Sequence, residues 1–124
     1  MQEKSVKLSV PAEPRFARLV RMTAANLAVL CGLGVDEVED LRMIAEEGFV
    51  YSCATKPSAC DISFECAADH VTIDFALGSF APVEEGEEGS LSLVELLLDA
   101  VCDEFEVTDA NMLHLTRKIG DANA

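Results

Sequence analysis

The sequence predicts an α/β (α+β) fold, a two-layer sandwich in which helices cover one face of a mixed, mostly antiparallel sheet. Apolar and polar residues alternate in short segments near the start, the middle and the end of the chain, which is the period of half-buried strands. Between these segments apolar residues recur at helical spacing. The resulting order is strand, helix, helix, strand, strand, loop, helix, strand, strand, which two packed layers accommodate.

Composition favours one acidic domain that spans residues 1–124. Half of the 124 residues are hydrophobic, which is enough for a single core. Nine basic residues against 23 acidic ones give a formal charge of −14, which repels nucleic acid and anionic membranes at long range. Because no run is long enough to span a membrane and the N-terminus has no signal-peptide pattern, we expect a cytoplasmic protein with a basic protein partner.

The N-terminal segment predicts a strand and a long helix. Val6, Leu8 and Val10 alternate with polar residues, and Pro11 ends this strand. A helix is expected over about residues 15–30, before two glycines that mark its end. Its apolar stripe consists of Phe16, Leu19, Val20, Thr23, Leu27 and Leu30. Such a stripe packs against the sheet or forms a surface for a dimer or another partner, and the sequence does not separate these alternatives.

A second helix is expected to begin at Asp36. Asp36 and Glu39 have the spacing of a capping box, and Val35 has the position of a hydrophobic staple. The apolar stripe of this helix consists of Val38, Leu41, Ile44, Ala45 and Phe49. A turn over residues 56–58, which contains a proline, follows the helix.

Two alternating segments then predict an antiparallel hairpin. The apolar residues of its first strand are Cys60, Ile62, Phe64 and Cys66, and those of its second strand are Val71, Ile73, Phe75 and Leu77. Residues 68–70 form the short connection between them. The two apolar faces should share one cover of helices.

The remainder of the chain predicts an acidic loop, a helix and a closing pair of strands. Residues 79–89 contain four glutamates and a proline, a composition typical of an exposed loop. A third helix with Ser90 as its cap carries Leu91, Val94, Leu97, Leu98 and Val101. Strands are expected from residue 105 and over 111–119, with a turn at 109–111 between them.

The five cysteines do not predict a disulfide framework. They are Cys31, Cys53, Cys60, Cys66 and Cys102, an odd number without a CxxC pair. Zinc binding by Cys53, Cys60, Cys66 and His70 is an alternative, and with it a thiol- or metal-dependent sensor, but the spacing matches no standard ligand pattern. His70 and His114 are isolated in the sequence and indicate no catalytic histidine.

Several segments together resemble the anti-sigma factor serine-protein kinases, a branch of the histidine-kinase-like (GHKL) ATPases. The resemblance begins with Leu8-Ser9-Val10-Pro11-Ala12 and the helix through Arg21, and continues in Val35-Asp36-Glu37-Val38-Glu39-Asp40-Leu41-Arg42. It extends through Ala45-Glu46-Glu47, the hairpin, residues 93–101 and the final strand, which is nearly the whole chain. The resemblance implies a Bergerat-type fold, a sigma factor or an anti-anti-sigma-like regulator as partner, and a homodimer.

The same resemblance implies where a nucleotide would bind. It places the catalytic general base at Glu47 and the asparagine that holds Mg²⁺ at Tyr51, where a phenol is a poor ligand for a hard cation. The Asp-x-Gly motif that binds adenine falls on Ala76-Leu77-Gly78, and Ala76 offers no acceptor. A buried adenine amine without a partner would cost about 1–3 kcal/mol.

The glycine-rich segment that approaches the phosphates falls on residues 89–93. Gly89 is retained, but Ser90 and Ser92 stand where the resemblance implies glycines, and the acidic loop of residues 79–89 takes the place of the lid over the nucleotide. We therefore expect an anti-sigma-factor-like regulator with an eroded ATP site, which binds proteins without a cofactor or metal. The alternative is an active serine-protein kinase that uses Glu47, ATP and Mg²⁺.

Overall fold

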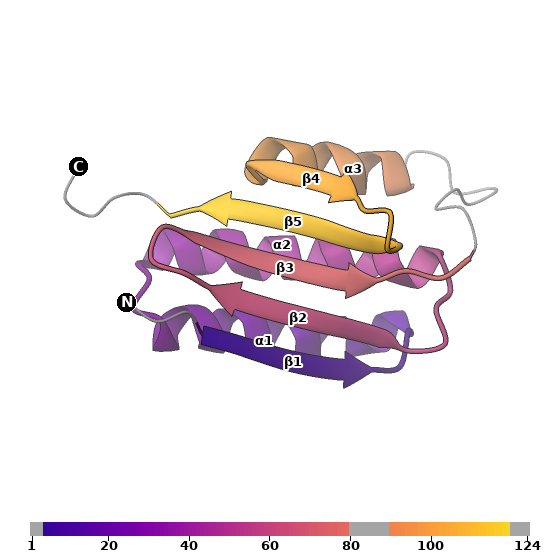
Figure 1. Ribbon diagram of the computed structural model, residues 1–124, viewed down its shortest axis with the longest axis horizontal. Coiled ribbons are helices and arrows are strands. Elements are labelled where there is room, and N and C mark those ends of the chain that lie inside the picture. The colour runs from indigo at the N-terminus through magenta and orange to yellow at the C-terminus, as the bar shows by residue number, and fades with distance from the viewer. Residues whose placement is uncertain (1–3, 80–89, 120–124) are drawn as a thin grey trace.

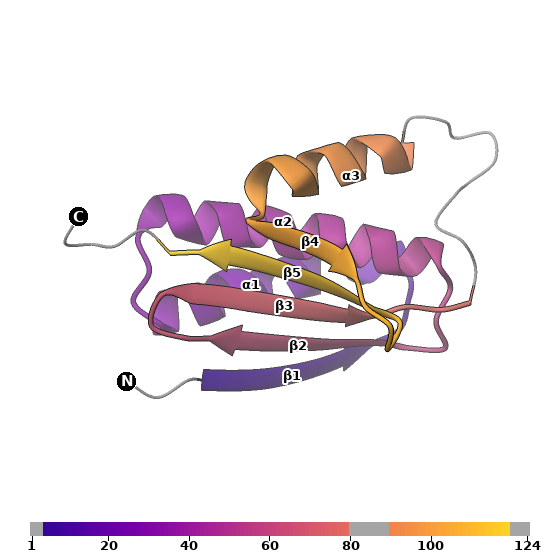
Figure 2. The same cartoon turned by 45° about the horizontal axis from the view of Figure 1, so that its top comes forward.

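The computed structural model describes residues 4–79 and 90–119. Its strands are β1 (Lys4–Val10), β2 (Cys60–Cys66), β3 (His70–Ala76), β4 (Glu104–Val107) and β5 (Met112–Lys118), and they form one five-stranded sheet in the order β1-β2-β3-β5-β4. Its helices are α1 (Ala17–Leu30), which follows the short 3₁₀ helix η1 (Pro14–Phe16), α2 (Val35–Ala54) and α3 (Ser90–Val101). All three α-helices lie on the same face of the sheet, which confirms the two-layer α+β arrangement (Figures 1 and 2).

The sequence led us to expect a mixed sheet. This prediction is wrong, because every neighbouring pair of described strands is antiparallel. Strands β3 and β4 run in the same direction and are connected through α3. Strand β5 then turns back and lies between them, with Ile73 opposite Leu115 on one side and Phe105 opposite Leu115 on the other. This insertion separates the two parallel strands.

Helix α2 begins at Val35, and its N-cap lies two residues before Asp36, the cap expected from the sequence. Gly34 is the N-cap, and its backbone N–H donates to Oε1 of Glu37 at 3.2 Å, so the capping box uses Gly34 and Glu37 rather than Asp36 and Glu39. Glu39 instead forms an ion pair with Arg42, one turn along the helix. Val35 is 78% exposed and makes no hydrophobic staple.

The core lies between the sheet and α2, the middle helix of the layer. Ile44 and Phe49 of α2 and Phe75 and Leu115 of the sheet are all 1% exposed or less. A methyl group at Gly48 would lie 2.4 Å from Cε1 of Phe75, so only glycine lets the helix sit this close to β3.

Helix α1 packs through a face that differs in part from the expected stripe. Val20, Ala24 and Ala28 are buried, because the two alanines let the helix approach the sheet closely. Leu19 and Leu30, which belong to the stripe identified in the sequence, are 48% and 70% exposed. They lie on the solvent side of the helix.

The expected loop over residues 79–89 lies outside the described residues, except for its first residue, Ser79. Within the described segments, no helix combines the length and the apolar character that crossing a membrane requires.

Candidate functional site

Tyr51, which stands at the position implied for a magnesium ligand, is part of the packing between α2 and its neighbours. It is 5% exposed, and its ring meets that of Phe105 edge to face, with the centroids 6.2 Å apart. Burial raises the pKa of Tyr51, and the carboxylate of Glu95 on α3 raises it further. The phenol therefore stays neutral, and an aromatic ring fills the place of a polar amide.

Glu47 lies one helical turn before Tyr51, on the same face of α2. Its side chain is partly exposed, and desolvation raises its pKa above 4.5, with a smaller contribution from the negative charge of Glu46. Glu46 itself pairs with Arg21 of α1 at 3.4 Å. A raised pKa is a property that a general base uses, so Glu47 is compatible with the role that the resemblance implies for it.

The backbone at the end of β3 is already hydrogen-bonded within the protein. The hydroxyl of Ser52 on α2 donates to the carbonyl of Ala76 at 2.7 Å. The Ser52 hydroxyl also lies 3.1 Å from the sulfur of Cys60, which is fully buried. Ser52 therefore ties the last turn of α2 to β2 and β3.

Both backbone polar groups of Gly78 are hydrogen-bonded within the protein. Its N–H donates to the hydroxyl of Thr55 at 2.7 Å, and its carbonyl accepts from Nδ2 of Asn111 at 3.1 Å. A Cβ at Gly78 would lie 2.1 Å from the carbonyl oxygen of Thr55. The glycine of the resembled adenine motif is thus required here for packing against the end of α2, and its polar groups have internal partners.

The phosphate-binding segment is described only in part. Ser90 and Ser92 lie in the first turn of α3, but their side chains are outside the described part of the structure, as is Gly89 altogether. Among the described positions of the expected site, Tyr51 packs against Phe105 of β4, whereas Ala76 and Gly78 lie against Ser52 and Thr55 at the end of α2. The buried phenol of Tyr51 and the hydrogen-bonded backbone of Gly78 are poorly suited to hold Mg²⁺ and adenine.

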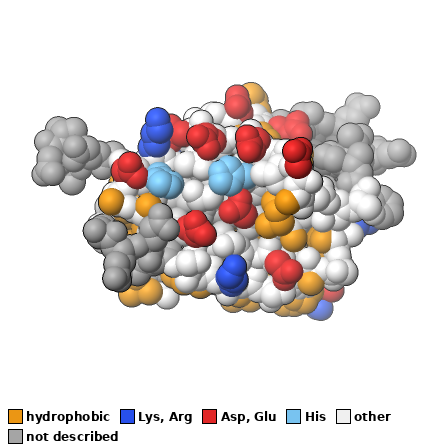
Figure 3. Space-filling view, in the orientation of Figure 1, with side chains coloured by type: hydrophobic (Ala, Val, Ile, Leu, Met, Phe, Trp, Pro, Cys, Tyr) orange, Lys and Arg blue, Asp and Glu red, His pale blue; other side chains and the backbone are white. Residues whose placement is uncertain are grey.

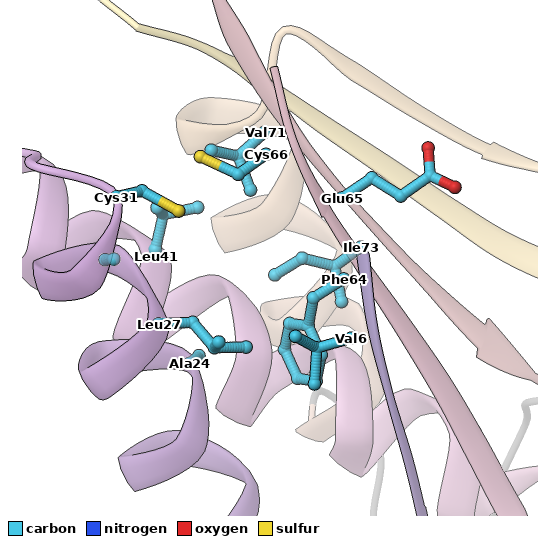
Figure 4. Close-up of a pocket in the computed structure, with 11 residues that line it drawn as sticks. Val6, Ala24, Leu27, Cys31, Leu41, Phe64, Glu65, Cys66, Val71 and Ile73 are labelled. Atoms are coloured by element: carbon cyan, nitrogen blue, oxygen red, sulfur yellow. The ribbon is translucent and has the colours of Figure 1, made fainter. Parts of the chain in front are cut away.

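A small cavity lies elsewhere, between α1 and strands β1, β2 and β3 (Figure 4). Its volume is about 30 Å³, and its lining is almost entirely carbon and sulfur, with Leu27, Phe64 and Ile73 among the contributors. The carboxylate of Glu65 points away from it. Since a single water needs at least about 10–15 Å³ and polar partners, this cavity has no room for a nucleotide.

The open face of the sheet carries a polar cluster that the sequence did not reveal. Asp74 and His114 lie opposite each other on β3 and β5, and Nδ1 of His114 is 2.6 Å from Oδ1 of Asp74. On its other side, Nε2 of His114 is 3.2 Å from the hydroxyl of Thr116 and 3.7 Å from Glu104. Figure 3 shows the two histidines of this face surrounded by carboxylates. The alternation of each strand indicated the face, but not the pairing between strands.

The four residues of the zinc alternative are not brought together. Cys60 begins β2 and Cys66 ends it, which separates them by about 20 Å of extended chain. Among residues 4–79 and 90–119, no group of three or more potential ligands is placed to hold a metal ion. Burial raises the pKa of both Cys53 and Cys102 to about 12, so these thiols stay protonated and unreactive at neutral pH.

Comparison with known proteins leaves the family open, since no family model matches the chain and no curated protein matches it. The resemblance to anti-sigma factor kinases therefore rests on the motifs quoted above and on the order of the elements.

Proposed function

We propose that this protein is an anti-sigma-factor-like regulator that acts by binding another protein and does not use ATP. The observation that carries the proposal is the double engagement of Gly78, by Thr55 on one side and Asn111 on the other. These bonds commit the backbone of Gly78 to the protein itself, and Ala76 beside it supplies no side-chain acceptor for adenine.

Three further observations support the proposal. The order of the described strands and α-helices, which apolar periodicity predicted, is compatible with the resemblance. The packed ring of Tyr51 replaces an amide ligand. The net charge of −14 favours a basic partner protein over nucleic acid, because like charges repel each other out to a distance of about 8 Å at physiological salt.

Calorimetric titration of the folded protein with ATP and with ADP, each with Mg²⁺, tests the loss of nucleotide binding. We expect no saturable heat and no shift of the melting temperature. Ligand at 100 times its dissociation constant would raise stability by about 2.7 kcal/mol, which a thermal melt detects readily. Saturable micromolar binding would contradict the proposal.

Affinity capture from a native lysate of the source cells tests the partner. We expect mass spectrometry to recover a sigma factor or a regulator of one, and we expect the yield to be unchanged after nucleotide is removed with apyrase. The variant Glu47→Gln should capture the same protein, since the proposed binding needs no general base. Recovery of neither class of protein would count against a role in transcription.

A kinase is the second candidate, and the raised pKa of Glu47 is the observation that favours it. In that case Glu47 would accept the proton from a serine hydroxyl of the partner. Transfer of labelled phosphate from ATP to the captured partner, lost in Glu47→Gln but retained in Glu46→Gln, would establish this candidate in place of the first.

A further inference from the structure

Helix α1 presents an apolar face that the core does not use. Its large apolar residues Leu19, Met22, Val29 and Leu30 are 48%, 51%, 61% and 70% exposed. They lie across the helix from the buried Val20, and a shallow hollow that includes Met22, Asn26 and Val29 runs along this face. The start of the helix is also basic, because Arg18 and the preceding Arg15 of η1 are exposed and α1 contains no carboxylate. Arg21 pairs with Glu46 of α2 and is not part of this face.

Helix α3 presents a second apolar face of opposite charge. Leu93 and Leu96 are 54% and 66% exposed, across the helix from the buried Val94. Glu95 and Asp99 lie on the solvent side of the same helix. From residue 90 to residue 107 the chain has five carboxylates and no lysine or arginine.

The two faces lie on opposite sides of the molecule. Helix α2 is between α1 and α3 and contacts both of them (Figures 1 and 2). Residues 4–33, which form β1 and α1, hold five basic residues and a single carboxylate, Glu13. The protein is therefore basic along one side and acidic along the other, despite its negative net charge.

We propose that the α1 face of one copy binds the α3 face of a second copy, head to tail. This pairing covers both apolar faces and sets Arg15 and Arg18 against the carboxylates of α3. Symmetric pairing would be unfavourable in either form, since α1 against α1 brings together only arginines and α3 against α3 only carboxylates. An interface that uses two different surfaces of each copy is heterologous, so the assembly grows into a ring or a chain.

The interface is small. Helices of 14 and 12 residues are about 20 Å long, so their contact falls below the roughly 1,200 Å² of a standard interface. We therefore expect weak association that becomes visible only at high protein concentration. At about 0.15 M salt the long-range repulsion between copies is screened beyond about 8 Å, which makes this the condition for the measurement.

Sedimentation velocity of the full chain at about 5–500 μM tests the proposal. The average mass should rise with concentration beyond that of a monomer. The variant Arg15→Glu/Arg18→Glu and the variant Glu95→Lys/Asp99→Lys should each remain monomeric. An equimolar mixture of the two should associate again, because each reversed face then meets a face of opposite charge. This rescue also shows that both variants are folded.

The charge reversals Lys7→Glu and Glu65→Lys on the open face of the sheet are matched controls, and they should associate as the unaltered chain does. A chain that stays monomeric at the highest concentration would overturn the proposal. So would association of the Glu95→Lys/Asp99→Lys variant by itself, which would indicate an α1–α1 interface. Association of the Arg15→Glu/Arg18→Glu variant by itself would indicate an α3–α3 interface instead.

Discussion

Because Gly78 has no side chain, the end of β3 packs closely against the end of α2. The carbonyl oxygen of Thr55 occupies the space that any Cβ would need, at 2.1 Å. The Thr55 hydroxyl accepts the N–H of Gly78 and donates to the carbonyl of Ser52, both at 2.7 Å. The glycine would be needed for folding even in a protein that binds no nucleotide.

The variant Gly78→Ala should therefore unfold more easily. Backbone atoms cannot yield as a flexible side chain does, so we expect a loss of at least about 2 kcal/mol in the free energy of unfolding, measured by urea denaturation. Gly34→Ala is the control, since its Cβ would have no neighbour nearer than 3.8 Å, and it should cost about 1 kcal/mol or less. Unchanged stability of Gly78→Ala would show that this glycine serves something other than packing.

The raised pKa of Glu47 predicts how the stability of the protein depends on pH. A carboxyl with a higher pKa in the folded state destabilises the protein when it is ionised, and this cost disappears as pH falls through the raised value. Glu47→Gln should therefore melt at a higher temperature than the unaltered chain at pH 7, and this difference should disappear at acidic pH. Glu46→Gln, which removes the partner of Arg21, should show no such increase.

At the scale of elements, Gly48 sets the distance between α2 and the sheet. Glycine within a helix usually costs about 1 kcal/mol relative to alanine, so replacement by alanine is normally stabilising. Here the added methyl would meet Phe75, which is fully buried and cannot move aside. We expect Gly48→Ala to lower the free energy of unfolding by about 1–2 kcal/mol net, since overpacking costs about 1–3 kcal/mol.

A double-mutant cycle with Phe75→Leu isolates this contact. If Gly48 is needed because of the ring of Phe75, the alanine should cost less in the Phe75→Leu background than in the unaltered chain. Equal costs in the two backgrounds would locate the clash elsewhere, for example at Leu115, whose Cδ1 would lie 3.1 Å from the new methyl.

The positions of helices and strands were predicted well where a local pattern of apolar residues defines them. They were predicted less well where neighbouring residues compete for the same role, as helix cap or as buried residue. The described strands and α-helices lie close to where periodicity placed them, with ends that differ by a few residues. The start of α2 was misplaced because Gly34 and Asp36 both precede a glutamate at capping distance, and the sequence favours the residue with an acceptor side chain. In α1 the pattern favoured leucines over alanines for burial, but the small side chains of the alanines allow closer packing.

At the scale of the whole molecule, the net negative charge destabilises the folded state. With a formal charge of −14, the folded chain repels itself, and salt weakens that repulsion. We expect the melting temperature at neutral pH to rise by several degrees between about 10 mM and 150 mM sodium chloride, as measured by circular dichroism. An unchanged or lower melting temperature would mean that local ion pairs, such as Arg117 with Asp40 at 2.7 Å, outweigh the net repulsion.

The sequence does not predict the order of strands in the sheet, and the candidate site depends on that order. Each strand's pattern indicates an inner and an outer face, but not which strand is its neighbour. For this reason the pair Asp74 and His114, which are 40 positions apart, went unpredicted. The polar contacts of Thr55, Gly78 and Asn111 were missed for the same reason, since three distant segments meet there.

The late position of β5 in the chain has a consequence for synthesis. Because β4 pairs only with β5, neither it nor the free side of β3 can be completed until residues 112–118 have left the ribosome. Until then the nascent chain exposes β3 as an open edge of unpaired backbone groups, which invites pairing with other chains. The strand β5 is thus the one that joins β4 to the rest of the described sheet, and a chain arrested shortly before it would expose an unpaired edge that chaperones bind.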